Sequence, residues 1–111
     1  KGAIFFDDAK AGHFAYIGDS ILGRDTNLGA GTKLANLGLR RSEVRVKHPD
    51  TEELVGTGLD KFGAIMSDES QTGCNSVLNP GSILMQKTLV LGCTSFLGTL
   101  RKGHVGTLVR K

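Results

Sequence analysis

A six-residue repeat, an abundance of glycine and a scarcity of aromatic residues predict an all-β fold for this 111-residue chain. The fold they indicate is a left-handed parallel β-helix of hexapeptide repeats, in which each hexad forms one short strand and one corner. The chain has 16 glycines, two prolines, no tryptophan, five phenylalanines and one tyrosine, which suits a coil with many tight corners better than an ordinary globular core. The length supports one domain, 1–111.

The first block of the repeat places an aliphatic or aromatic residue at every sixth position. These expected core residues are Tyr16, Leu22, Leu28 and Leu34. A small hydroxyl residue stands four places after each of the first three, at Ser20, Thr26 and Thr32. We expect the large residues to point into a narrow axial core and the small ones to fit where the chain turns.

A second block restores the same register after an interruption. Its expected core residues are Met66, Thr72, Leu78, Leu84, Val90 and Phe96. Its hydroxyl residues are Ser70, Ser76, Ser82, Thr88 and Thr94. Amphipathic helices would instead repeat apolar residues at spacings of three and four, so the period of six disfavours a helix over 14–36 and 64–97.

The register breaks between the blocks, at about 37–60. Residues 42–47 alternate charged with β-branched side chains, 48–51 carry a turn signal around Pro49, and 52–55 supply a second short run. This pattern predicts a β-hairpin inserted into the coil. The hexads are lost again at about 97–111, which predicts either a cap over the open end of the coil or a frayed terminus.

Charge and targeting signals narrow the classes of partner. The formal charge of +3 comes from scattered positive residues, which favours small anionic ligands such as phosphates over nucleic acid. No apolar run approaches the ~18 residues needed to cross a membrane, and no leader is recognisable. Cys74 and Cys93 lack the paired spacing of a redox or zinc motif, so we expect reduced thiols in a cytoplasmic protein. The first residue is not methionine, which suggests a domain excised from a longer chain.

Two stretches resemble a known family of transferases. Residues 10–20 (KAGHFAYIGDS), followed by 27–32 (NLGAGT) and 35–36 (AN), resemble the acetyltransferase domain of bifunctional N-acetylglucosamine-1-phosphate uridylyltransferases. Similarity is closer still to the archaeal type of bifunctional sugar-1-phosphate nucleotidyltransferase/acetyltransferase, which has a similar hairpin insert followed by a segment like 61–68 (KFGAIMSD). The resemblance implies a C-terminal β-helix domain behind an N-terminal nucleotidyltransferase domain. It also implies a homotrimer that transfers acetyl from acetyl-CoA to an amino-sugar 1-phosphate in clefts between neighbouring coils.

The same resemblance implies roles for individual residues. His13 matches the general base, and Asn36 matches a residue of the catalytic centre that contacts the acetyl donor. The remaining matches are Lys1, Tyr16 and Lys61 for the sugar phosphate, Asn27 for the sugar, and the backbone of Ala30 for the oxyanion. These residue types suit the reaction, because imidazole accepts a proton near neutral pH and a fixed backbone amide stabilises an oxyanion. The reaction requires no metal.

Structural roles for these residues stay open from the sequence. Asn27 and Asn36 are also suited to bridging backbone groups at corners, Tyr16 to packing in the core, and Lys61 to a solvated position at the base of the hairpin.

The sequence also bears on two other functions for the whole chain. Gly92-Cys93-Thr94 and residues 84–87 depart from the regular glycine-bearing corners of the family, so a catalytically silent module for oligomerisation or regulation is the alternative. A carbonic anhydrase on the same coil would need three converging histidines, and His13, His48 and His104 lack the spacing.

Overall fold

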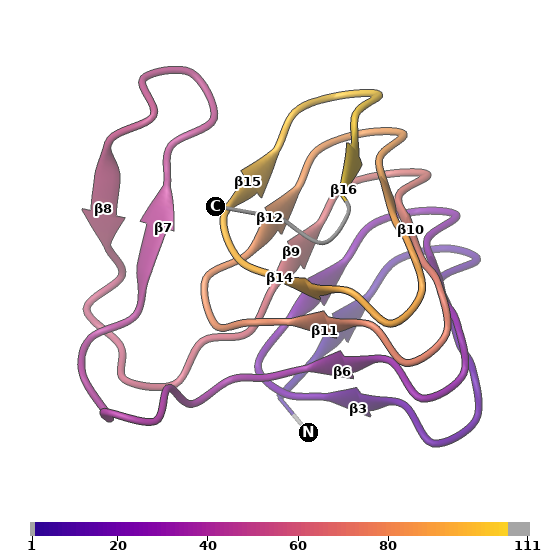
Figure 1. Cartoon of the computed structure of the whole chain (residues 1–111), viewed down its shortest axis with the longest axis horizontal. Coiled ribbons are helices and arrows are strands. Elements are labelled where there is room, and N and C mark those ends of the chain that lie inside the picture. The colour runs from indigo at the N-terminus through magenta and orange to yellow at the C-terminus, as the bar shows by residue number, and fades with distance from the viewer. Residues whose placement is uncertain (1, 107–111) are drawn as a thin grey trace.

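The computed structural model describes residues 2–106, which coil into three parallel sheets joined by tight corners (Figure 1). The first sheet contains β1 (Ile4–Phe5), β4 (Ile21–Leu22), β9 (Ile65–Met66), β12 (Ile83–Leu84) and β15 (Thr99–Leu100). The second contains β2 (Lys10–Ala11), β5 (Asn27–Leu28), β10 (Gln71–Thr72), β13 (Leu89–Val90) and β16 (Val105–Gly106). The third contains β3 (Tyr16–Ile17), β6 (Lys33–Leu34), β11 (Val77–Leu78) and β14 (Ser95–Phe96). The predicted β-helix is therefore confirmed.

The core is a single column of side chains along the coil axis. In nearly every strand the second residue points inward, because neighbouring residues of a strand face opposite sides. The buried members of this column are Leu22, Leu28, Leu34, Met66, Thr72, Leu78, Leu84, Val90 and Phe96. Nine of the ten core positions expected from the repeat are thus buried, and the exception is Tyr16.

Tyr16 faces outward, so its expected place in the core is wrong. It is 47% exposed, and its neighbour Ile17 packs against the core instead. Tyr16 pairs with Lys33, 17 positions on, whereas Val77 pairs with Ser95, 18 positions on. The corner after β3 has three residues where the regular corners of the coil have four, which shifts the inward position by one.

The corners are closed by a buried ladder of hydroxyl groups. All eight expected serine and threonine residues are buried. Typical bonds run from Thr26 Oγ1 to the carbonyl of Gly23 at 3.0 Å and from Ser76 Oγ to the carbonyl of Gly73 at 2.9 Å. No buried side-chain nitrogen or oxygen among residues 2–106 lacks a hydrogen-bond partner. Short hydroxyl side chains fit here because they fill little volume and satisfy turn carbonyls locally.

The predicted hairpin leaves the coil at the corner between the third and first sheets. Its strands β7 (Arg45–Lys47) and β8 (Leu54–Gly56) pair antiparallel beside the coil (Figure 1). An isolated antiparallel bridge between Leu37 and Lys61 closes its base. Across this insert β4 still pairs directly with β9, so the coil stacks on without a gap.

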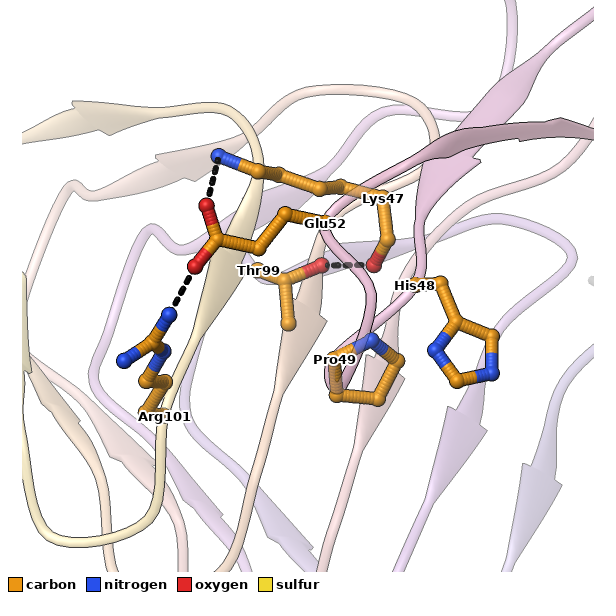
Figure 2. A pocket seen from close by; sticks show the side chains of 6 residues that line it. All are labelled: Lys47, His48, Pro49, Glu52, Thr99 and Arg101. Atoms are coloured by element: carbon orange, nitrogen blue, oxygen red, sulfur yellow. Dashed lines mark hydrogen bonds and ion pairs between the residues drawn. The ribbon is translucent and has the colours of Figure 1, made fainter.

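The hairpin tip is fastened to the last described turn of the coil (Figure 2). The Thr99 hydroxyl donates to the carbonyl oxygen of Lys47 at 2.5 Å. The Glu52 carboxylate forms an ion pair with Arg101 and lies 4.0 Å from Lys47 Nζ. The hairpin is thus held at both its base and its tip.

The segment expected as a cap or tail, about 97–111, continues the coil as far as it is described. β15 pairs parallel with β12, and β16 with β13. Thr99 pairs with Ile83 only 16 positions earlier, so the shortened turn hides these strands from a search for hexads. Residues 107–111 lie outside the described range.

Candidate functional site

Three of the polar side chains near the start of the hairpin form one hydrogen-bonded cluster. The Tyr16 hydroxyl donates to Asn36 Oδ1 at 3.3 Å, and Asn36 Nδ2 donates to Asp19 Oδ2 at 2.6 Å. Tyr16 is on β3, and the other two lie at the corner that follows the third sheet, on successive turns of the coil. The two asparagine bonds orient its amide completely, since one end meets an acceptor and the other a donor.

Gly18 leaves the room that this cluster needs. A Cβ atom at Gly18 would lie 2.6 Å from both Cγ and Nδ2 of Asn36 and 2.9 Å from the Tyr16 hydroxyl oxygen. These separations are far inside van der Waals contact. Glycine at this buried corner therefore allows the Asn36 amide to lie flat against the backbone.

The backbone that follows Lys61 is tied to the same cluster. Phe62 N–H donates to the carbonyl oxygen of Asn36, and Gly63 N–H donates to that of Asp19, both at 2.8 Å. Lys61 is exposed at the base of the hairpin. The returning strand of the insert thus brings the expected phosphate-binding lysine beside Asn36, although it follows 25 residues later.

His13 and Ala30 occupy the corner between the second and third sheets, one turn apart. The carbonyl of His13 accepts a hydrogen bond from Gly31 N–H at 2.7 Å, and the His13 side chain is exposed. The Ala30 carbonyl accepts a bond from Asn75 N–H, while the Ala30 amide donates no hydrogen bond within residues 2–106. A backbone amide that is free to donate can stabilise a developing oxyanion. Corner residue Cys74, one turn further along, has an equally open amide, so this feature comes from the coil itself.

Lys33 links these two groups of residues and was missed by the sequence analysis. It pairs with Tyr16 across the third sheet, and its ammonium donates to the carbonyl oxygens of Phe14 at 3.0 Å and Gly31 at 2.7 Å. Within residues 2–106 no carboxylate lies close enough to pair with it. No ion pair among the described residues therefore offsets the charge of this ammonium, which lies next to the His13 corner. Asp19 was also missed, because an aspartate at a predicted corner looks like an ordinary turn residue.

Asn27 lies apart from these residues. It begins β5 on the exposed face of the second sheet, between Lys10 and Gln71. Tyr16 is on the third sheet, so the two residues flank the His13 corner from opposite sides. Lys1, the remaining expected phosphate ligand, lies outside the described residues. One chain therefore places the described site residues at two corners of the coil and on the strands beside them, without enclosing them.

A large hollow lies elsewhere on the described surface, between the hairpin and the coil. It has a volume of about 750 Å³, and none of the expected site residues lines it. Its walls combine the cationic Arg40, Arg45 and Lys47 with the apolar Leu54 and Leu97. The candidate site therefore rests on the hydrogen-bonded geometry around Tyr16 and His13, not on a closed cavity. Within residues 2–106 no cluster of three or more histidine, cysteine or acidic residues is placed to bind a metal ion.

Comparison with known proteins identifies the kind of domain. Over 81 residues the chain is 35% identical to a bifunctional sugar-1-phosphate nucleotidylyltransferase/acetyltransferase of Sulfurisphaera tokodaii, a match that covers 73% of this chain and 20% of that protein. It is 38% identical over 81 residues to the bifunctional protein GlmU of Methanococcus vannielii, covering 73% of this chain and 19% of that protein. The chain is a hexapeptide-repeat β-helix domain matching the C-terminal region of these GlmU-like proteins.

Further comparisons agree with this assignment. The hexapeptide domain spans about one-fifth of the length of these curated relatives. It is also 31% identical over 88 residues to the uncharacterized acetyltransferase YaiX of Escherichia coli, covering 79% of this chain and 37% of that protein. Its fold matches serine acetyltransferase 1 of Entamoeba histolytica with a TM-score of 0.70 at 11% identity, over 95% of this chain and 36% of that one. No protein-family model matches the chain. Residues 2–106 contain no helix able to span a membrane.

Proposed function

We propose that this hexapeptide domain is an acetyl-CoA-dependent N-acetyltransferase that acts on an amino-sugar 1-phosphate. In the whole protein it would accompany a sugar-1-phosphate nucleotidyltransferase domain, in the cytoplasm where these metabolites are made. The observation that carries the proposal is the placement of His13 and the Ala30 amide at one corner of the coil and of the Tyr16–Asn36 pair along the third sheet that leads from it. The similarity to bifunctional nucleotidylyltransferase/acetyltransferases supports the choice of reaction.

Each group has a defined part in the proposed reaction. The amine nitrogen of the acceptor bonds to the carbonyl carbon of the thioester, and His13 takes the proton that the amine loses. The Ala30 amide donates to the carbonyl oxygen as negative charge develops on it. The carbon–sulfur bond then breaks, and coenzyme A leaves as a thiol once it receives a proton. The ammonium groups of Lys33 and Lys61 attract the phosphate and hold the acceptor in place.

A homotrimer would complete the site. The expected residues are spread over two corners and the strands beside them, so a neighbouring coil is needed to enclose the substrates. Apolar residues on and beside the second sheet offer a surface for such a neighbour, since Leu89 is 40% exposed and both Leu91 and Val105 are 49% exposed. Burial of these side chains between copies would stabilise the assembly.

Release of thiol from acetyl-CoA tests the proposal. The purified chain is assayed with glucosamine 1-phosphate and galactosamine 1-phosphate, and its oligomeric state is measured by light scattering. We expect His13→Ala to lower turnover by roughly 10²-fold or more while trimers persist, as for loss of a general base. His104→Ala, which removes an exposed histidine from a different corner, should leave the rate unchanged.

A wild-type trimer that releases no thiol with either acceptor would contradict the acetyltransferase proposal. The same outcome would support the alternative, in which the coil only holds copies of a nucleotidyltransferase together. The exposed apolar residues of the second sheet are the observation that favours this alternative.

A further inference from the structure

We propose that Asp19 is a positioning residue that fixes which way the hydrogen bond of Tyr16 points. Asp19 orients the Asn36 amide, and the amide oxygen accepts the single phenolic proton of Tyr16. The Tyr16 oxygen then presents a lone pair to the acceptor substrate. Tyr16 would then bind an N–H or O–H group of the amino sugar instead of its phosphate. This inference rests on the proposed function and refines the role of one residue in it.

The argument begins with the chemistry of the carboxylate. An ionised aspartate only accepts hydrogen bonds, so the group that faces it must be a donor. Asn36 Nδ2 lies 2.6 Å from Asp19 Oδ2, a short separation typical of a bond to a charged acceptor. The two ends of a carboxamide are otherwise interchangeable. The carboxylate removes that choice and turns Oδ1 of Asn36 away from itself.

The orientation of Asn36 then determines the orientation of the Tyr16 hydroxyl. Asn36 Oδ1 is an acceptor and lies 3.3 Å from the phenolic oxygen, so the tyrosine must be the donor. A phenol has only one proton. With that proton directed at Asn36, the outward side of the oxygen carries lone pairs and repels phosphate oxygens. Sugar hydroxyls and the amine are the donor groups of the acceptor.

Backbone contacts hold the Asp19–Asn36–Tyr16 hydrogen bonds in place. Asp19 has a φ of 46°, a left-handed conformation that aspartate tolerates better than most residues. Its carbonyl accepts the bond from Gly63 N–H at 2.8 Å, which ties it to the strand returning from the hairpin. Gly18 lets the Asn36 amide approach the corner closely. Because the supports are backbone bonds, loss of the carboxylate should free the amide without loosening the corner.

The phosphate has other partners in this arrangement. Lys33 pairs with Tyr16 on the third sheet, and Lys61 follows the hairpin at the residue before Phe62, whose amide bonds to Asn36. Both are cations without a carboxylate partner among residues 2–106. The lysines therefore attract the phosphate by charge, and Tyr16 accepts a hydrogen bond from a donor group on the sugar.

A double-mutant cycle tests the inference, with Asp25→Ala as the matched control. Asp25 has the same left-handed conformation, with a φ of 56°, at a corner that does not touch Tyr16 or Asn36. We expect Asp19→Ala to lower kcat/KM for the acceptor roughly tenfold, the scale of one hydrogen bond, mainly through KM. Asp19→Asn should recover most of this loss, because its amide oxygen still accepts from Asn36. In a Tyr16→Phe background Asp19→Ala should have no further effect.

Two outcomes overturn the inference while the enzyme remains active. One is an Asp19→Ala enzyme that matches Asp25→Ala. The other is a tenfold loss that persists in the Tyr16→Phe background, which would mean that Asp19 acts on the fold and not through Tyr16.

A second measurement tests the Asp19–Asn36 bond even if the chain has no acetyltransferase activity and the proposed function fails. The side-chain amide signals of Asn36 in a ¹⁵N-labelled sample should shift in Asp19→Ala and stay in place in Asp25→Ala. Signals that do not respond to Asp19→Ala would show that the carboxylate does not orient Asn36.

Discussion

The hydroxyl oxygens of Thr32 and Thr72 lie 3.0 Å apart inside the coil, on neighbouring turns. Thr72 occupies a core position that an apolar residue fills elsewhere in the column, and Thr32 is a corner residue. Thr32 also reaches the carbonyl of Gly73 at 3.2 Å. The pair is thus a polar bond inside an otherwise apolar axis, where an unsatisfied hydroxyl is costly.

Removal of one hydroxyl of this pair should cost more than removal of both. We expect Thr32→Val to lower the free energy of unfolding by about 1–3 kcal/mol, because the buried Thr72 hydroxyl loses its side-chain partner. The double variant Thr32→Val/Thr72→Val should regain part of that loss. Chemical denaturation at one fixed protein concentration measures both. Strictly additive losses would show that the two hydroxyls are not coupled.

Close stacking of the turns makes Gly29 intolerant of a side chain. A Cβ there would lie 2.6 Å from the backbone nitrogen of Cys74. We expect Gly29→Ala to destabilise the coil by about 1–3 kcal/mol, since backbone must move to admit the methyl group. Gly38→Ala is the control, because nothing lies within 4 Å of its Cβ position. Equal denaturation midpoints for the two variants would contradict the stacking argument.

The ion pairs at the hairpin tip should govern local opening more than global stability. Glu52 pairs with Arg101 on the last described turn, and all the side chains involved are well exposed. We expect Glu52→Gln to speed hydrogen exchange of the amides in β7 and β8, while the free energy of unfolding falls by no more than about 1 kcal/mol. Glu53→Gln, one residue along and outside these ion pairs, is the control. Unchanged exchange in Glu52→Gln would mean that Thr99 alone secures the tip.

Lys33 should matter for acceptor binding more than for folding. Among the residues that the structure describes, its ammonium bonds to the carbonyls of Phe14 and Gly31, and both bonds are exposed enough for water to replace them. We expect Lys33→Gln to raise KM for the amino-sugar 1-phosphate roughly tenfold, the effect of one charge-assisted bond to phosphate, with little change in the unfolding midpoint. Lys87→Gln changes the same charge at a distant corner and should leave KM alone. A kcat effect without a KM effect would place Lys33 outside the phosphate site.

The repeating part of the fold could be predicted because every regular turn needs the same residue types at the same positions. A buried residue and a small hydroxyl recur at positions such as Leu28 and Thr32, and no other regular structure needs that period. The short turns could not be predicted because missing corner residues shift the register. One missing residue after β3 led to Tyr16 being expected in the core instead of Ile17, and two missing residues before β15 hid that strand. In the candidate site, the resemblance singled out Tyr16 and Asn36, and the structure adds the bond between them. Asp19 and Lys33 could not be found in the same way, because their importance comes from contacts across turns.

The direct pairing of β4 with β9 has a consequence for the architecture as a whole. Ile21 stacks on Ile65 as if the intervening residues were absent. The hairpin is therefore a branch on a continuous spine. A β-bridge joins the two at the base of the hairpin, and a hydrogen bond and an ion pair join them at its tip. Such an arrangement allows the branch to change in length or sequence while the spine keeps its spacing. It also allows the spine to gain whole turns beyond the branch without moving the residues clustered at its root.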